Sequence, residues 1–254
     1  MLKIENLHAY YGKSHVLHGV SFDVGQGEIV ALLGRNGSGR STTAKAIMGL
    51  VDCEGTINWK GQSIQGKKPF EIAHLGLGYV PENRDIFPKL SVFENLRCGV
   101  LWSLGYKYTL FRFLADLQDA NDRAEELMHM IRLDKKHDTL AMNLTYAEQR
   151  ALEIGITIAG GANVILLDEP TAGMSKSETS RFIDLIREVT VGKTLLTVEH
   201  DMGVVFGLAD KIAVVVYGEV IAFDTPEAVR ANPKVQEAYL GSVLADQQAA
   251  EAGH

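Results

Sequence analysis

The sequence predicts an α/β fold with a mainly parallel sheet that is interrupted by a helical segment. Three observations predict it: a glycine-rich loop between an apolar strand and a helix, helical texture from Ser91 to about Ala159, and strand–helix alternation in the last third. Such alternation needs crossover connections, which cover the faces of a parallel sheet with helices. A chain of 254 residues, 46% of them hydrophobic, is long enough for one large core.

The first third of the chain is expected to hold strands, glycine turns and one helix. Residues 1–33 alternate as strands do and end in the short apolar run Glu28–Leu33, which suits a buried strand. Residues 41–48 have helical apolar spacing. Further strands are predicted at Thr56–Trp59 and Leu77–Val80.

Helices dominate the middle of the chain and alternate with strands in its last third. Asp116–Met130 is predicted as an amphipathic helix with its apolar residues on one side. The later predicted elements are a strand at Val164–Leu167, a helix at Glu178–Val189, a strand at Thr194–Val198, a helix after His200 and a strand at Lys211–Val216. The tail from Ser242 is rich in Ala, Gln and Glu and is expected to be frayed.

The glycine-rich loop has the spacing of a cradle for nucleotide phosphates. Its residues are Gly34, Arg35, Asn36, Gly37, Ser38, Gly39, Arg40, Ser41 and Thr42. Gly34 and Gly39 would let the backbone curl around phosphates and direct N–H groups at their oxygens. The Ser41 hydroxyl would contact a magnesium ion, and the helix beginning near Arg40 would direct the positive end of its dipole to the β-phosphate. Arg40 stands where this motif has lysine.

Two carboxylates end an apolar strand in the last third of the chain. At this edge of an open α/β sheet, Asp168 would hold magnesium and Glu169 would polarise an attacking water as general base. A solvated acidic turn is the alternative, and the phosphate loop upstream favours the site. His200 follows another predicted strand, which is ordinarily a structural position, but its order after the acidic pair favours a role in the chemistry.

The segment Leu144–Arg150 precedes an apolar helical run and has the pattern of a helix start. Thr145 is the predicted N-cap, and Glu148 is its capping-box partner. This local role is sufficient to explain the pattern. A helix N-terminus also binds phosphate, and the two interpretations do not exclude each other.

Composition narrows the class of protein to a soluble globular one. The net charge of −7 argues against a general nucleic-acid binder. Cys53 and Cys98 lie far apart, which predicts neither a disulfide framework nor a zinc site, and both are expected to be small buried apolar residues in a reducing cytosol. The N-terminus has no secretory pattern, and the apolar stretch Gly155–Leu167 is too short to span a bilayer, so other chains would cross any membrane involved.

Taken in order, these motifs resemble those of the ATP-binding subunits of ABC transporters, over residues 1–241. They are Tyr11 before Gly12, the loop 34–42, Tyr79–Glu82, Leu144–Gln149, Leu167–Pro170 and His200 with Asp201. One such motif is weak, whereas six in order are specific. The resemblance implies a P-loop NTPase core in a single domain 1–241. It also implies an antiparallel β subdomain near the N-terminus, an α-helical subdomain inserted at about 88–159, and a flexible tail at 242–254.

The resemblance also implies a role for each motif in binding ATP and Mg²⁺. Tyr11 would stack on adenine, and Glu169 would be the catalytic base. Ser41, Glu82 and Asp168 would serve the magnesium ion and the attacking water. His200 would contact the γ-phosphate. The residues expected to bind the γ-phosphate held by the other subunit are Thr145, Tyr146, Ala147 and Glu148.

Within that family, three segments look like the branched-chain amino acid importer subunits of the LivF type: Lys45–Leu50, Gly76–Pro88 and Glu169–Met174. Tyr146 and the apolar insertion Leu101–Leu114 look more like the LivG-type partner. This likeness implies an ATP-hydrolysing subunit that energises uptake of branched-chain amino acids or related small solutes. Its implied partners on the cytoplasmic face of a bacterial inner membrane are a second ATP-binding subunit, identical or different, two permease subunits and, indirectly, a solute-binding protein.

Three departures from the family pattern bear on turnover. Arg40 replaces a compact ammonium by a planar fork, which either reaches the phosphate oxygens or displaces them. Ala147 replaces a glycine, and Ser175 stands where many members have aspartate. These changes suggest an attenuated ATPase, and the alternative is a nucleotide-gated regulatory module with little turnover. The insertion 101–114 is either a buried helix or a docking surface for a membrane subunit.

Overall fold

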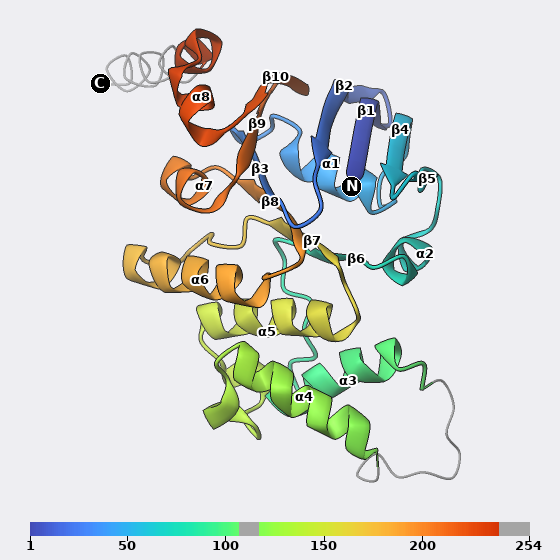
Figure 1. Cartoon of the computed structure of the whole chain (residues 1–254), viewed down its shortest axis with the longest axis vertical. Coiled ribbons are helices and arrows are strands. Elements are labelled where there is room, and N and C mark those ends of the chain that lie inside the picture. The colour runs from blue at the N-terminus through green and yellow to red at the C-terminus, as the bar shows by residue number, and fades with distance from the viewer. Residues whose placement is uncertain (107–116, 239–254) are drawn as a thin grey trace. The chain divides into compact units, whose positions relative to one another are not determined.

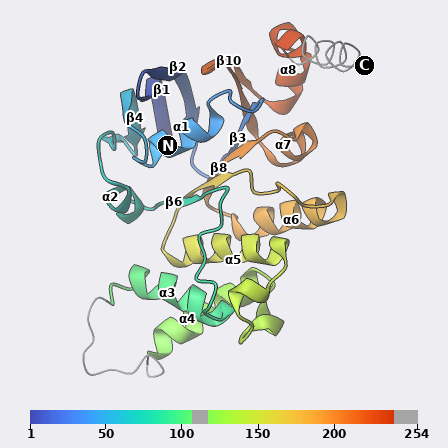
Figure 2. The ribbon, with the colours of Figure 1, turned by 180° about the vertical axis from the view of Figure 1, so that it is seen from behind.

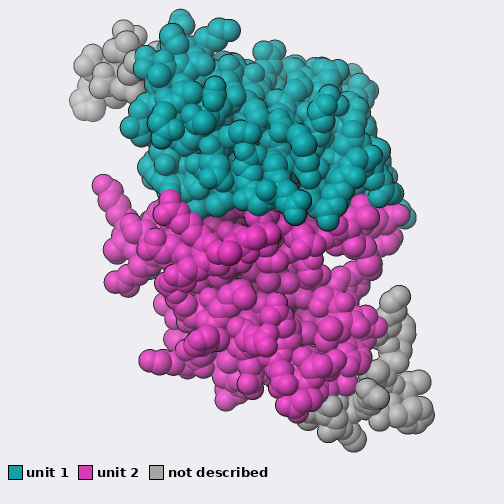
Figure 3. All heavy atoms as spheres, in the orientation of Figure 1, with its two compact units in different colours: residues 1–68, 198–254 teal, residues 69–197 magenta. Residues whose placement is uncertain are grey.

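The computed structural model describes residues 1–106 and 117–238 (Figure 1). The chain forms two compact units, of which residues 1–68 with 198–254 make the first and residues 69–197 make the second (Figure 3). Strand β8 (Thr194–Glu199) crosses the boundary between the two. Both units combine strands with helices, which confirms the predicted α/β class.

The first unit contains an antiparallel sheet, a group of three further strands and three helices. Its elements are β1 (Leu2–Tyr11), β2 (Ser14–Val24), β3 (Ile29–Gly34), α1 (Arg40–Ile47), β4 (Cys53–Trp59), β5 (Gln62–Ser63), α7 (Met202–Leu208), β9 (Lys211–Val216), β10 (Glu219–Asp224) and α8 (Pro226–Ala231). The antiparallel sheet has the order β2-β1-β4-β5, and the other strands have the order β10-β9-β3. Strands β3 and β9 are parallel, whereas β9 and β10 are antiparallel.

Two kinds of apolar pattern produce these strands. In the hairpin β1–β2, alternate residues are buried, and Leu7 lies opposite Val20. Strand β3 is instead buried on both faces, as expected where helices cover a parallel pair. Val205 of α7 and Val229 of α8 belong to the same core as Leu33. The predicted run Glu28–Leu33 is therefore a buried strand, as expected.

The second unit carries the helical part of the chain and the strands that precede and follow it. Its elements are α2 (Pro69–His74), β6 (Leu77–Val80), α3 (Val92–Ser103), α4 (Gln118–Met130), the 3₁₀ turns η2 (Asp134–Lys136) and η3 (Ala141–Asn143), α5 (Tyr146–Ala159), β7 (Val164–Asp168) and α6 (Lys176–Val189). Strands β6 and β7 are parallel, with Leu77 opposite Val164. Helices α3, α4 and α5 pack together and lie side by side in both ribbon views (Figure 1, Figure 2).

The structure corrects the expectation for the two cysteines. Cys98 is exposed and Cys53 is only half-buried, and both are free thiols. Cys98 faces outward because the buried side of α3 is formed by Asn95, Leu96 and Val100. Partial desolvation by neighbouring atoms raises the pKa of both thiols, with nearby Asp52 adding to the rise at Cys53. The sequence also left β5, α2, β10 and α8 without a prediction.

The predicted subdomain at about 88–159 contains α3, α4 and α5. The extent of the single domain 1–241 stays a prediction, since the tail 242–254 lies outside the described residues. Residues 107–116 also lie outside the described residues. They include most of the apolar insertion Leu101–Leu114 and the first residue of the helix predicted at Asp116–Met130. Among the described helices, none combines the length and apolar run that a bilayer crossing needs.

Two glycines near β4 allow a test of backbone packing. Gly55 has φ of 112°, and a Cβ there would lie 2.3 Å from the Asn6 carbonyl oxygen, whereas Gly61 has φ of 80° with no atom within 4 Å of its Cβ position. We expect Gly61→Ala to lower the free energy of unfolding by about 1–2 kcal/mol for its left-handed backbone. Gly55→Ala should cost about 1–3 kcal/mol more because it also forces the strands apart. Urea unfolding measures both, and equal costs would contradict the packing argument.

Candidate functional site

The predicted phosphate loop connects β3 to α1 in the first unit. Arg35, Asn36 and Gly37 are exposed, while Ser38 is buried. The Ser38 N–H donates to the Arg35 carbonyl at 3.0 Å, and the Ser38 carbonyl accepts the Gly218 N–H at 2.8 Å. The loop is thus closed on itself and fixed to the turn between β9 and β10.

Two glycines of the loop are required by close packing. A Cβ at Gly34 would lie 2.4 Å from the Val215 carbonyl oxygen and 2.5 Å from the Ser38 hydroxyl oxygen. Gly39 has φ of 103°, and a Cβ there would lie 2.6 Å from Leu17 Cδ2. Both positions therefore need glycine for packing, while their expected role in curling around phosphates stays a prediction.

Helix α1 begins without a side-chain cap. Its N-cap is Gly39, and no acidic residue lies in its first turn. In contrast, α3, α5 and α6 each begin with a capping box. No side-chain hydrogen bond therefore caps the start of α1, and the helix dipole favours an anion there. Ser38 Oγ is also buried with no hydrogen-bond partner in the part of the chain that the structure describes. These features fit a phosphate group.

Arg40 lies within the loop rather than projecting into solvent. Its side chain is 4% exposed. One guanidinium nitrogen of Arg40 donates to Asn36 Oδ1 at 3.3 Å. Arg40 Cδ lies 3.3 Å from the position that a Cβ on Gly34 would take. The side chain thus bends back over the cradle. Ser41 and Thr42 follow as half-buried residues of the first helical turn.

Tyr11 and His200 also belong to the first unit. Tyr11 is the last residue of β1 and is 49% exposed, so its ring is accessible for stacking. His200 is exposed and follows β8 directly. Asp201 has a local role, because its carboxylate accepts the Gly203 N–H at 2.7 Å and caps α7.

The acidic pair ends β7 in the second unit. Asp168 is buried, and its carboxylate accepts the Tyr79 hydroxyl at 2.9 Å. Glu169 is half-buried and has φ of 46°, a left-handed conformation that costs free energy for a residue with a side chain. Asn6, Lys60, Arg132 and Tyr217 also have positive φ, so this conformation by itself does not mark a catalytic residue. A solvated acidic turn would not bury Asp168, so the structure disfavours that alternative.

The predicted helix start at Thr145 is confirmed. The Thr145 N–H donates to Glu148 Oε2 at 2.9 Å, and the Glu148 N–H donates to Thr145 Oγ1 at 3.4 Å. Burial opposes ionisation of Glu148, but the Thr145 hydrogen bonds and nearby Lys136 outweigh it and lower the pKa of this carboxyl. Tyr146 and Ala147 follow as half-buried residues of the first turn of α5.

The candidate residues divide between the two units. The loop 34–42, Tyr11 and His200 lie in the first, whereas Glu82, Thr145–Glu148 and the Asp168–Glu169 pair lie in the second. The described residues include no cluster of three or more His, Cys, Asp or Glu side chains that would bind a metal. The sequence assigned Tyr79 no role of its own, because its contact with Asp168 arises only from the parallel pairing of β6 with β7.

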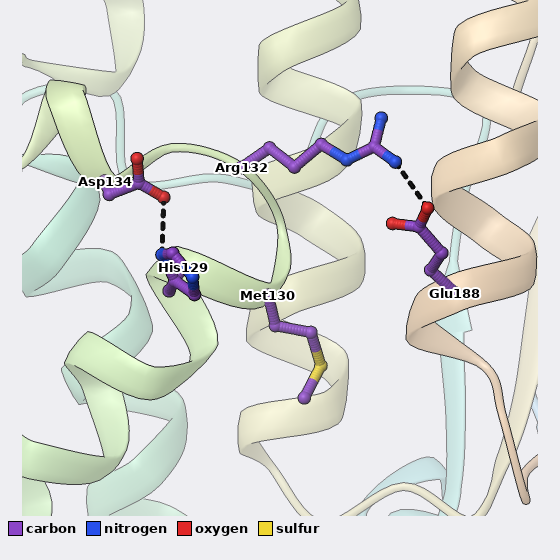
Figure 4. A pocket seen from close by; sticks show the side chains of 5 residues that line it. All are labelled: His129, Met130, Arg132, Asp134 and Glu188. Carbon is purple, nitrogen blue, oxygen red and sulfur yellow. Dashed lines mark hydrogen bonds and ion pairs between the residues drawn. The ribbon is translucent and has the colours of Figure 1, made fainter.

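An open pocket in the second unit lies at the ends of α4 and α6 (Figure 4). Arg132 pairs with Glu188 at 2.6 Å, and His129 pairs with Asp134 at 3.1 Å. Met130 completes its lining. Each basic group faces a carboxylate, and none of the predicted site residues lines this pocket, so we assign it no role.

Comparison with known proteins agrees with the motifs. The family model described as ABC transporter matches residues 17–172, and the model described as branched-chain amino acid ATP-binding cassette transporter matches residues 219–245. The chain is 32% identical to the high-affinity branched-chain amino acid transport ATP-binding protein BraG of Pseudomonas aeruginosa, over 95% of this chain and 100% of BraG. It is 33% identical to LivG of Salmonella typhimurium, over 95% of this chain and 98% of that protein.

A solved structure has the same architecture. The ADP conformation of an ATP-binding cassette of an ABC transporter matches with a TM-score of 0.82 and 28% identity, over 95% of this chain and 98% of that chain. Its fold therefore extends over nearly all of both proteins.

Proposed function

This chain belongs to the ABC transporter family of ATP-binding proteins, and we propose that it is the ATP-hydrolysing subunit of an importer for branched-chain amino acids or related small solutes. The names of its relatives and the match of its C-terminal segment support this solute class. The observation that carries the ATP-binding role is the glycine-lined loop before α1, whose helix start has no side-chain cap. The similarity to LivG supports a LivG-type subunit. The segments Lys45–Leu50, Gly76–Pro88 and Glu169–Met174 support a LivF-type subunit instead.

The proposed chemistry uses residues from both units. The loop 34–42 binds the phosphates through its N–H groups, and Tyr11 stacks on the adenine. Magnesium, when bound, neutralises phosphate charge, and Ser41, Glu82 and Asp168 are the residues that would hold it and position the water. Glu169 accepts a proton from the attacking water, while His200 donates a hydrogen bond to the γ-phosphate.

We further propose that two such subunits, identical or different, close face to face on ATP. In that dimer the helix start at Thr145–Glu148 of one subunit binds the γ-phosphate held by the other, in addition to capping α5. Hydrolysis reopens the pair, and two permease subunits convert this motion into alternating access for solute from a binding protein. The subunit would thus work at the cytoplasmic face of a bacterial inner membrane.

A second candidate function is a nucleotide-gated regulatory module with little turnover. The position of Arg40 favours it, because a guanidinium that bends over the cradle occupies space that phosphate oxygens would need. The buried Asp168 next to Glu169 favours turnover instead, since a purely regulatory site has no need for a carboxylate pair fixed at the end of a strand.

Replacing the proposed base tests the hydrolytic role. We expect Glu169→Gln to lower ATP turnover by about 10²–10⁴-fold, because the water loses its proton acceptor, while ATP binding is retained and the closed dimer is favoured. Steady-state ATPase assays, nucleotide titration and size-exclusion chromatography measure these effects. The matched control is Glu219→Gln on β10, an exposed position. Hydrolysis by Glu169→Gln at the parent rate would show that the base is assigned wrongly.

Substitutions at Arg40 distinguish the hydrolytic function from the regulatory one. Arg40→Lys restores a compact donor, so we expect nucleotide affinity to be kept and turnover to rise or stay within about tenfold, or about 1.4 kcal/mol in barrier. Arg40→Ala removes the charge beside the phosphates and should cost several kcal/mol of transition-state stabilisation. ATPase assays with nucleotide titration on the chain assembled with its partners measure both. If Arg40→Ala behaves like the parent, the arginine takes no part in catalysis and the regulatory function is favoured.

An exposed aromatic group at the end of α3 supports a docking surface there. Trp102 is 52% exposed and Phe70 is 55% exposed, and His74 lies between them with its ring 4.7 Å from Trp102. Tyr106 donates its hydroxyl to Asp119 at 2.9 Å. The Trp102 side chain is therefore exposed at the end of α3, and Phe111, which belongs to the same hypothesis, lies outside the described residues.

We expect charged substitutions at Trp102, Tyr106 and Phe111 to weaken assembly with membrane subunits while leaving ATP affinity unchanged, because a charge in an apolar interface is left without a partner. Co-purification with the permease subunits measures assembly. Val191→Glu is the control, since Val191 is exposed at a different place, after α6. Unchanged co-purification, or loss of folding in the Trp102 variant, would refute the docking surface.

A further inference from the structure

A buried arginine on α5 holds the loop that carries Glu82. The Arg150 side chain is fully buried, and its guanidinium donates to the carbonyl oxygens of Pro81 and Glu82, each at 2.6 Å. It also pairs with Glu153 at 2.9 Å. Glu153 in turn accepts the backbone N–H of Asp85 at 2.8 Å. Two side chains that are one helical turn apart therefore bind three main-chain groups of this loop.

The exposed Arg84 makes further contacts between this loop and α5, nearer the start of the helix. Arg84 on the loop donates to Gln149 Oε1 at 2.6 Å. Its guanidinium also lies over the Tyr146 ring at 4.5 Å, and Arg150 lies 5.7 Å from the same ring. The first turn of α5 and the loop after β6 are thus joined by side chains from both.

Arginine has the geometry that this contact needs. Its planar fork satisfies two successive carbonyl groups and a carboxylate at once, which the point charge of lysine does not do. Burial raises the pKa of Glu153, although the Asp85 N–H and Arg150 oppose that rise. The ionised form of Glu153 is therefore stabilised by both the Asp85 N–H and Arg150. The loop and the helix move together as long as these hydrogen bonds persist.

We propose that Arg150 is a positioning residue that couples the start of α5 to Glu82. The inference rests on the proposed function, in which Thr145–Glu148 bind the nucleotide of the other subunit and Glu82 serves the nucleotide of its own chain. Since the α5 start and the Arg150 side chain that binds the Glu82 carbonyl belong to the same helix, a ligand that displaces the former displaces the latter. Occupancy of one composite site thereby sets the position of Glu82 in the other.

Hydrogen exchange on the nucleotide-free protein tests the contact itself. We expect Arg150→Lys to speed exchange of the Asp85 amide by about tenfold and Arg84→Ala to speed it by about threefold, because each loosens the loop. The control is Arg123→Lys, since Arg123 pairs with Glu126 on α4 at the same spacing, but on the surface. Its Asp85 exchange should equal that of the parent.

Steady-state kinetics on the chain assembled with its partner subunits tests the coupling. We expect Arg150→Lys to lower kcat by about tenfold with the KM for ATP changed less than about twofold, and Arg84→Ala to act in the same direction. Parent-like exchange or parent-like kcat in both variants would overturn the coupling. If Arg150→Lys does not fold, the exposed Arg84→Ala decides alone. A parent without ATP hydrolysis overturns the proposed function and this inference with it, whereas an active parent with unchanged variants overturns the coupling only.

Discussion

The start of α1 is the constraint on which the candidate site depends. An anion is bound there by backbone N–H groups only if no side chain already caps them, and Gly39 meets this condition. The chain must then enter the helix through a left-handed residue packed against Leu17, and it must leave β3 through a glycine packed against Val215. The hairpin β1–β2 and the strand β9 are therefore the walls that shape the loop, and substitution of either glycine would disturb both.

A second buried contact organises the other unit. Arg150 and Glu153 place a charged pair in the interior, where an unpaired member would be costly. The cost is offset because both groups also bind main-chain atoms of the loop after β6. An apolar pair of similar volume would fill the space but would leave the carbonyls of Pro81 and Glu82 without donors. The pair thus fixes the part of the loop, residues 82–85, that has only polar and charged side chains.

Features that depend on residues close together in the sequence could be predicted, whereas contacts between distant residues could not. The β3 run, the glycine loop and the Thr145–Glu148 cap depend on neighbouring residues, and the structure has them as predicted. The contacts of Tyr79 with Asp168 and of Arg150 with Pro81 join residues far apart in the sequence, so no local pattern pointed to them. Cys98 was expected in the core because cysteine is usually buried, but its angular position on α3 places it outside. The roles of the site residues stay predictions.

The three departures from the family pattern differ in their structural effect. Ser175 is the N-cap of α6 and accepts the Glu178 N–H, a role that aspartate also fills, so the exchange removes a charge and keeps the helix start. Ala147 lies in the first turn of α5, where alanine stabilises a helix better than glycine and only its methyl group restricts approach. Arg40 alone changes the space inside the cradle, because its side chain bends back over Gly34. Any difference in turnover from related subunits is therefore expected to originate in the phosphate loop rather than at the two helix starts.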